Sequence, residues 1–194
     1  MLINRIVLTI VFVGIYSVAI AQNINALDEN NGFQNYKFGM YKNDFTSCED
    51  RPSGYTGRCV ISRIHKINDI DASEVILFFI DSKLAKIEVH FGNSSRRSRL
   101  VEAIEAAFGS PTGRENYPIK NAITGSEINI VNPNEPQVIK WQADEVTLKH
   151  VYKRRFIGDN SMPILGNMGY LHLEFVLNNY DDLLDAYRTK KIHT

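Results

Sequence analysis

Five histidines are the side chains best suited to chemistry in this sequence, at positions 65, 90, 150, 172 and 193. Alternation along residues 84–91 predicts a strand that turns Ile87 and Val89 to one face and His90 to the other. The same pattern places His172 on the polar face of another strand, 170–177. If these two strands are neighbours, His90 and His172 approach and could bind a metal ion; two separate, solvated histidines are the simpler interpretation.

No catalytic signature accompanies the histidines. The sequence lacks H-E-x-x-H, the nucleophile elbow G-x-S-x-G, the G-x-G-x-x-G fingerprint and a P-loop. The turn 68–71 and the acids Asp181, Asp182 and Asp185 offer oxygen ligands for calcium, but turn formation and helix capping explain them better. A triad of a serine, a histidine and an acid assembled across the fold stays open. We therefore expect no catalytic residue, no metal and no cofactor.

The arginines Arg96, Arg97 and Arg99 are the strongest candidate binding residues. They fall in the first turn of a predicted helix, where cations oppose the helix dipole. A helix N-terminus beside arginines is a ready site for an anion, such as a partner's carboxylate, a phosphate or a lipid headgroup. The alternative is a solvated face whose acidic partners come from elsewhere in the chain.

The first 21 residues indicate the compartment. Arg5 is followed by an uncharged apolar run from Ile6 to Ala21 that closes on an A-x-A pattern, which is typical of a secretory signal peptide. An uncleaved anchor is the alternative, although the run is shorter than the roughly 20 residues that span a bilayer. We expect a periplasmic or secreted protein without a membrane span after cleavage, with residues 22–35 as a flexible leader and 36–194 as one domain.

Two cysteines, Cys48 and Cys59, predict a structural disulfide, because an even number of cysteines in an exported chain favours pairing. Pro52, Gly54 and Gly57 allow the segment between them to turn back. A bridge that closes a loop of about 12 residues should stabilise the fold by roughly 3 kcal/mol. A metal-binding or redox pair is less favoured, since no histidine lies close by and C-x-x-C is absent.

Hydrophobic patterning predicts an α+β fold, an antiparallel sheet with helices on one face. The expected strands are 60–67, 75–80, 84–91, 138–141, 146–156 and 170–177, and the second and third of these should form a hairpin. Helices are expected at 95–108 and 180–190, with a shorter one beginning near Gly39. The order of elements suggests two related α/β halves, about 36–92 and 93–194, and leaves two long connections, 112–136 and 157–169.

Packing and turn residues give the chain a resemblance to a known group. They are Phe38-Gly39-Met40, the hairpin 77–87, Phe108-Gly109-Ser110-Pro111 and Trp141. On these the chain resembles the β-lactamase inhibitory protein and the small outer-membrane assembly lipoproteins. The resemblance implies a helix pair packed on an antiparallel sheet and action by protein–protein contact. It transfers no functional residue, and the chain lacks the lipid-bearing cysteine of the lipoproteins.

The charge composition narrows the class of partner that the protein could bind. With 22 basic and 22 acidic residues the formal net charge is zero, which gives no electrostatic reason to expect a nucleic-acid partner. We expect a non-catalytic binding module that contacts another protein or a cell-envelope component, in an oligomeric state that the sequence does not indicate. The alternative is an envelope hydrolase. A hydrolase should bring a histidine to a carboxylate or serine in a pocket, whereas a binding module should expose an apolar patch with a polar rim.

Overall fold

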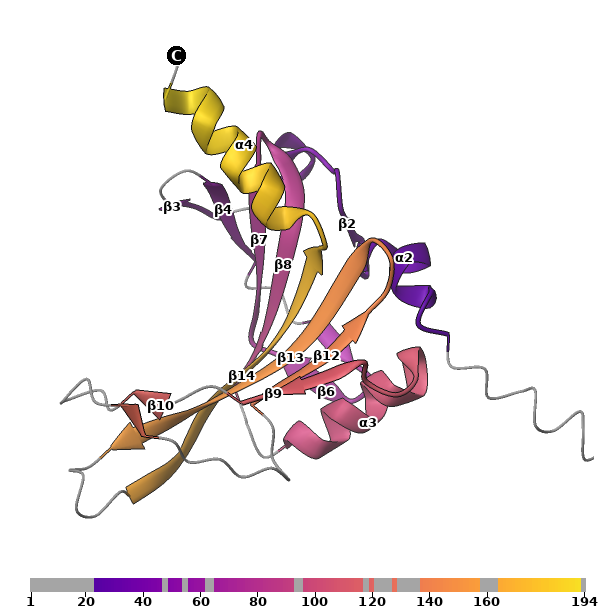
Figure 1. The fold of residues 1–194 in the computed structure, drawn as a ribbon, viewed down its shortest axis with the longest axis vertical. Coiled ribbons are helices and arrows are strands. Elements are labelled where there is room, and N and C mark those ends of the chain that lie inside the picture. Colours follow the sequence, from indigo (N-terminus) through magenta and orange to yellow (C-terminus); the bar gives the residue numbers. More distant parts are fainter. Residues whose placement is uncertain are drawn as a thin grey trace, which may run out of the picture.

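The computed structural model describes residues 23–46, 49–53, 56–61, 65–92, 96–116, 119–120, 127–128, 137–157 and 164–192. A single eight-stranded antiparallel sheet forms the centre of this described part, with α-helices packed around it (Figure 1). The predicted α+β class is therefore confirmed.

The sheet is built from two sets of four strands. From one edge to the other, its strands are β3 (Glu49–Ser53), β4 (Thr56–Ile61), β7 (Glu74–Ile80), β8 (Lys83–Phe91), β14 (Ile164–Leu177), β13 (Val146–Ile157), β12 (Val138–Gln142) and β9 (Gly113–Glu115). The first four precede residue 92 and the last four follow it. The two sets meet where β8 pairs with β14, and the interpretation as two related α/β halves stays a prediction.

The hairpin of β7 and β8 is as predicted. Its turn residues Asp81 and Ser82 both have positive φ, 48° and 66°, a backbone twist that matches the right-handed twist of paired strands. The register shifts once, between Phe78 and Phe79. This bulge adds Ala85 to β8 and lies at the end of the sheet nearest the turn.

One face of the sheet carries the core. Helix α3 (Arg97–Phe108) buries Leu100 and Ile104 against it, and helix α2 (Ala26–Asn30) buries Leu27 in the same cluster. Trp141, fully buried on β12, donates its indole N–H to the carbonyl of Gly109 at 2.8 Å, just past the end of α3. The helix predicted at 95–108 is thus confirmed from Arg97 onward, and α2 and α3 cover the same face.

The flexible leader predicted at 22–35 is wrong for residues 23–35. They include α2 and strand β1 (Gly32–Phe33), which pairs with β2 (Tyr36–Lys37). Asp28 explains why this polar segment is fixed: its carboxylate accepts the backbone N–H groups of residues 144, 145 and 146, at 2.9–3.1 Å. One side chain thereby ties α2 to the turn between β12 and β13.

The structure also differs from two other local predictions. The helix expected near Gly39 is replaced by a single 3-10 turn, η1 (Lys42–Asp44), because Gly39 and Met40 hydrogen-bond to the backbone of Leu84 instead of starting a helix. The single strand expected at 60–67 divides into the end of β4 and a small hairpin of β5 (His65–Ile67) and β6 (Ile70–Ala72). A second small hairpin joins β10 (Ile119–Lys120) and β11 (Glu127–Ile128).

The last connection is shorter than predicted. Strand β13 continues to Ile157 and β14 begins at Ile164, so only 158–163 of the connection expected at 157–169 lie outside strands and outside the described residues. The chain then ends in helix α4 (Tyr180–Ile192), close to the predicted 180–190. Unlike α2 and α3, α4 buries none of its residues. No helix among the described residues has the length and apolar character needed to cross a membrane.

Cys48 lies outside the described residues. Cys59 is fully buried on β4, within the core, and the Cys48–Cys59 bridge stays a prediction.

Candidate binding surface

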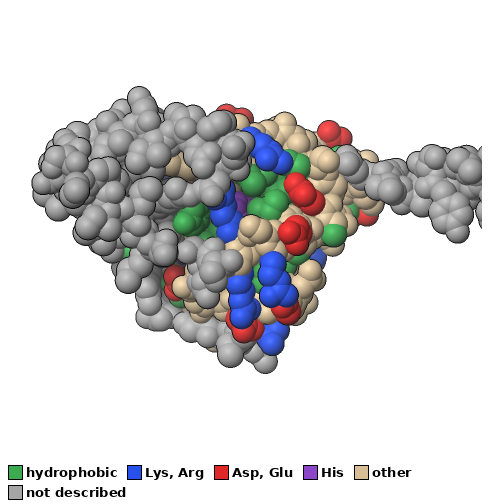
Figure 2. All heavy atoms as spheres, turned by 90° about the horizontal axis from the view of Figure 1, so that it is seen from below, with side chains coloured by type: hydrophobic (Ala, Val, Ile, Leu, Met, Phe, Trp, Pro, Cys, Tyr) green, Lys and Arg blue, Asp and Glu red, His purple; other side chains and the backbone are tan. Residues whose placement is uncertain are grey.

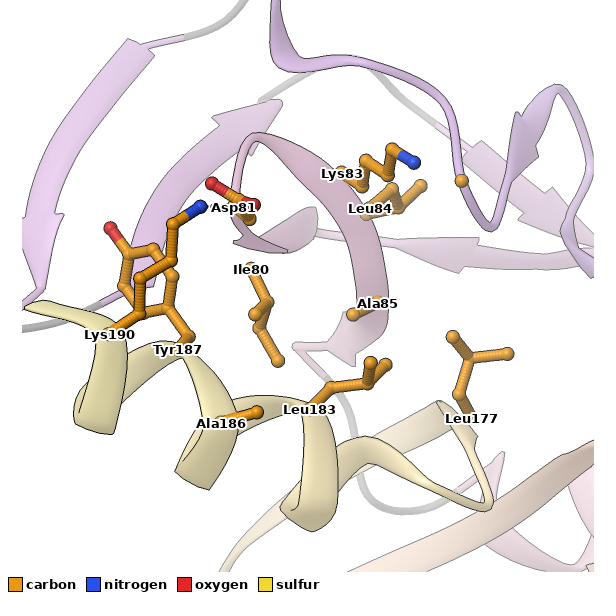
Figure 3. Close-up of a pocket in the computed structure, with 11 residues that line it drawn as sticks. Ile80, Asp81, Lys83, Leu84, Ala85, Leu177, Leu183, Ala186, Tyr187 and Lys190 are labelled. Atoms are coloured by element: carbon orange, nitrogen blue, oxygen red, sulfur yellow. Dashed lines mark hydrogen bonds and ion pairs between the residues drawn. The ribbon is translucent and has the colours of Figure 1, made fainter.

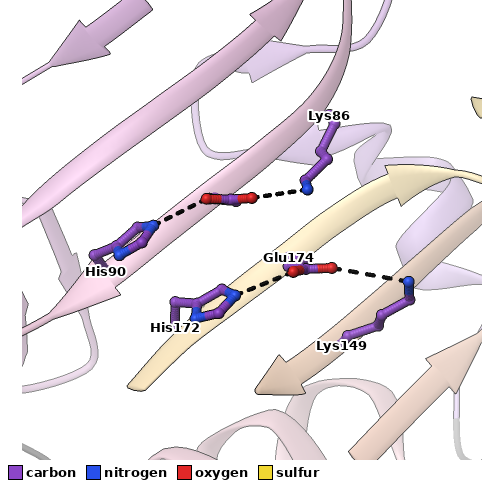
Figure 4. A network of polar contacts seen from close by, with 6 residues as sticks. Lys86, His90, Lys149, His172 and Glu174 are labelled. Carbon is purple, nitrogen blue, oxygen red and sulfur yellow. Dashed lines mark hydrogen bonds and ion pairs between the residues drawn. The ribbon is translucent and has the colours of Figure 1, made fainter. Parts of the chain in front are cut away.

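The sheet face opposite the core carries a paired ladder of charged residues. On β8 the residues Lys86, Glu88 and His90 follow one another at every second position, and their side chains are joined in series: Lys86 Nζ to Glu88 Oε1 at 2.7 Å, and His90 Nε2 to Glu88 Oε2 at 3.0 Å. On β14, His172 Nε2 lies 3.0 Å from Glu174 Oε1 in the same way. Figure 4 shows the two chains of contacts side by side.

The register places like residues opposite each other. His90 faces His172, and Glu88 faces Glu174, across the β8–β14 pair. Two carboxylates in this position repel, so cations must compensate them. Lys86 does so for Glu88, and Lys149 of β13 lies 3.8 Å from Glu174.

The pKa values of the carboxyl groups reflect this compensation. Burial alone would raise the pKa of Glu88, but hydrogen bonds from His90 and Lys86, together with the Lys86 charge, lower it to about 2. Glu174 shows the same balance: burial opposes ionisation, and the His172 hydrogen bond and the Lys86 charge outweigh it, so its pKa is lowered. Burial would lower the pKa of Lys86, yet Glu88 and Glu174 raise it. Glu88 and Glu174 are thus ionised at neutral pH and are held by hydrogen bonds and lysine charges from their neighbours.

The two histidines that the sequence placed on polar faces do meet. Their ring centroids lie 5.0 Å apart and the ring planes differ by only 10°. Because a ring nitrogen's lone pair lies in the ring plane, stacked parallel imidazoles do not aim their lone pairs at a common point. Among the described residues, no group of three or more candidate ligands is arranged to hold a metal ion.

His150 lies on the opposite face of β13, inside the core. It is completely buried, and neither of its ring nitrogens has a hydrogen-bond partner among the described residues. Burial, with a smaller contribution from the nearby Arg97 charge, lowers its pKa to about 3. The imidazole is therefore neutral at physiological pH, and it behaves as a packing residue.

A polar hollow of about 290 Å³ opens at the end of the ladder, where α4 begins. Three lysines from three strands of the sheet line it: Lys86 of β8, Lys140 of β12 and Lys149 of β13. The other ionisable residues of its wall are Glu174, Tyr180 and Asp181. Each lysine side chain is no more than one-third exposed. Burial raises the pKa of Tyr180, so its hydroxyl stays protonated and can donate a hydrogen bond.

An apolar groove of about 360 Å³ lies between α4 and the β7–β8 hairpin. Leu183 and Ala186 of α4 face Ile80 and Ala85 of the hairpin across it (Figure 3). At its outer end an exposed ion pair, Lys190 to Asp81 at 3.4 Å, connects the helix to the hairpin turn. Leu177 lines both this groove and the polar hollow.

The predicted arginine cluster makes internal contacts. Arg96 donates to the carbonyl of Asp69 at 3.1 Å, Arg99 pairs with the Asp69 carboxylate at 2.5 Å, and Arg97 lies over the ring of Tyr152 at 4.6 Å. The acidic partner is thus supplied by the β5–β6 turn. The space-filling view from below shows basic and acidic side chains interspersed on the described surface (Figure 2). An anion site at these arginines stays a prediction, in which the anion must compete with Asp69.

Alternation along residues 84–91 placed Lys86 and Glu88 on the same polar face as His90, and alternation along 170–177 placed His172 on a polar face. It did not find Glu174, Lys149 or the α4 surface beside them. Comparison with protein-family models, curated proteins and solved structures found no match. The resemblance to the β-lactamase inhibitory protein and the assembly lipoproteins therefore stays a prediction.

Proposed function

We propose that this protein is an exported, non-catalytic binding module that holds another protein through the surface around α4. The single observation that carries the proposal is the groove beside α4. This helix buries no residue, and its apolar residues Leu183 and Ala186 face a groove that the chain's described residues leave open. An apolar groove beside charged side chains is a common form of protein-binding surface.

The envelope hydrolase is less favoured, although each polar-face histidine does meet a carboxylate. Glu88 and Glu174 are neighbours of these histidines on their own strands, and each is also held near a lysine. On the adjoining strands, Glu74 of β7 lies opposite His90 and Val151 of β13 lies opposite His172. None of these four carries a hydroxyl or thiol that an imidazole would activate as a nucleophile. The hydroxyl of Ser73, beside His90, donates to the backbone carbonyl of His90 at 3.0 Å and not to its ring.

The test fills the groove. Ala186→Trp places an indole between α4 and the hairpin, whereas Asp185→Trp, one residue earlier, places it on the outer side of the helix. The control variant loses the exposed ion pair between Asp185 and Arg188, which should contribute little to stability. Each mature protein is immobilised and exposed to an envelope extract, and captured proteins are quantified.

The proposal expects a set of proteins captured by the wild type and by Asp185→Trp but lost with Ala186→Trp. Equal capture by all three forms would place the contact elsewhere. Retention of lipid or glycan by the wild type, in place of protein, would assign the surface to a different envelope component.

A further inference from the structure

The two longest helices differ in how they are held to the sheet. Helix α3 buries Leu100 and Ile104 in the core, and the indole of Trp141 donates a hydrogen bond to the carbonyl of Gly109 just past its end. Helix α4 is 13 residues long and buries none of them. A helix of this length is only marginally stable in water without tertiary contacts, so α4 depends on its contacts with the rest of the protein.

An asparagine fixes the chain firmly just before α4. Asn178 donates its backbone N–H to the carbonyl of Glu145 at 2.8 Å, and its side-chain amide donates to the two carbonyls of the turn 143–144 at 2.9 and 2.8 Å. Its side-chain oxygen accepts a hydrogen bond from the hydroxyl of Thr147 at 2.6 Å. These four bonds tie the end of β14 to the β12–β13 turn, and Asn179 alone separates them from the first residue of α4.

Beyond this anchor, α4 is held loosely against the β7–β8 hairpin (Figure 3). Leu183 and Ala186 line the groove of about 360 Å³ that separates the helix from the hairpin, and both are exposed. Near the end of α4, Lys190 pairs with Asp81 of the hairpin turn, but the two side chains are 69% and 68% exposed. Exposed ion pairs contribute little to stability. The helix is therefore fixed at one end and weakly held along its length.

We infer that α4 is a hinged lid, which turns about Asn179 to open and close the apolar groove while Asn178 and the sheet stay in place. The inference rests on the proposed function for its purpose: an adjustable groove admits an apolar side chain of the partner and then closes on it. Closure on that side chain would bury Leu183 and Ala186, which gives α4 the apolar contacts that it lacks in the free protein. In the free protein the lid should open often, because segments with few buried contacts open at the lowest free energy.

Native-state amide hydrogen exchange of the free mature protein tests the lid. The amides of α4 should exchange as one unit, at a rate that low concentrations of urea leave unchanged, because a local opening exposes little surface. Their protection should be at least about a hundredfold lower than that of the α3 amides. The backbone N–H of Asn178 should keep the protection of the sheet, which places the hinge after it.

Two neighbouring lysines provide a variant and its matched control. Lys190→Ala removes the ion pair with Asp81. Lys191→Ala makes the same change one residue later, where the ammonium lies over the ring of Tyr187 within α4 itself. The first variant should speed exchange about two- to fivefold throughout α4, the effect of losing one exposed ion pair. The control should exchange as the wild type does.

Protection of α4 equal to that of α3 would overturn the inference. So would fraying confined to the last turn of α4 with its first turns as protected as the sheet, because that pattern describes a fixed helix. Equal effects of the two lysine variants would also contradict it. Because the exchange experiment uses the free protein, its failure would leave the groove-filling capture experiment to decide the proposed function separately.

Discussion

The core histidine His150 should make the protein sensitive to mild acid. In the unfolded chain its pKa is near the ordinary 6.5, and in the fold burial lowers it to about 3. As pH falls below 6.5, the imidazole of His150 binds a proton in the unfolded state but stays neutral in the folded state. The free energy of unfolding therefore decreases progressively down to about pH 3. One pKa unit corresponds to about 1.4 kcal/mol, so this residue should remove about 2 kcal/mol between pH 7.5 and pH 5.

Urea unfolding of the wild type and of His150→Leu at pH 7.5 and pH 5 measures this effect. The leucine variant should lose about 2 kcal/mol less than the wild type over that interval. At pH 7.5 it should be at least as stable, because it removes two buried nitrogens that have no hydrogen-bond partner among the described residues. Glu88 and Glu174 do not confound the comparison: their lowered pKa values give stability that is lost only as pH falls below about 4.5. An identical pH dependence in the two proteins would refute the reasoning.

Three further predictions concern the packing and the cysteines. Asp28→Asn should destabilise the protein by about 1–3 kcal/mol in urea unfolding, because an amide cannot accept three backbone N–H groups as the carboxylate does; unchanged stability would mean that α2 is held by other contacts. Trp141→Phe should cost about 1–3 kcal/mol, since it leaves a small void and an unpaired carbonyl at Gly109, and a neutral result would contradict the packing described. Titration of the denatured, unreduced protein should find no free thiol at Cys48 and Cys59, and two free thiols would remove the predicted bridge.

The sequence predicts much of the sheet because side-chain alternation is a local signal. The hairpin of β7 and β8 and the helix α3 follow from residues close together in the chain. Alternation also sets His90 and His172 on a polar face. By the same rule His150 belongs with Val146 and Leu148 on the apolar face of β13, so its burial was predictable as well.

Local sequence patterns do not indicate which distant strands and segments lie side by side. The stacking of His90 on His172 depends on β8 being the neighbour of β14, a consequence of how the two halves join. The segment around Asp28 is polar and rich in asparagine, so it gives no local sign that the turn between β12 and β13 will fix it. The groove beside α4 is likewise formed by elements from opposite halves, the β7–β8 hairpin and the final helix.

The most direct test of the proposed function is an amide hydrogen-exchange map of the protein with and without a partner captured from the envelope extract. The account predicts slowed exchange upon binding in two segments, residues 80–86 and 177–190, with little change in α3 or the β5–β6 hairpin. Protection confined to those latter elements, with α4 exchanging as in the free protein, would contradict it.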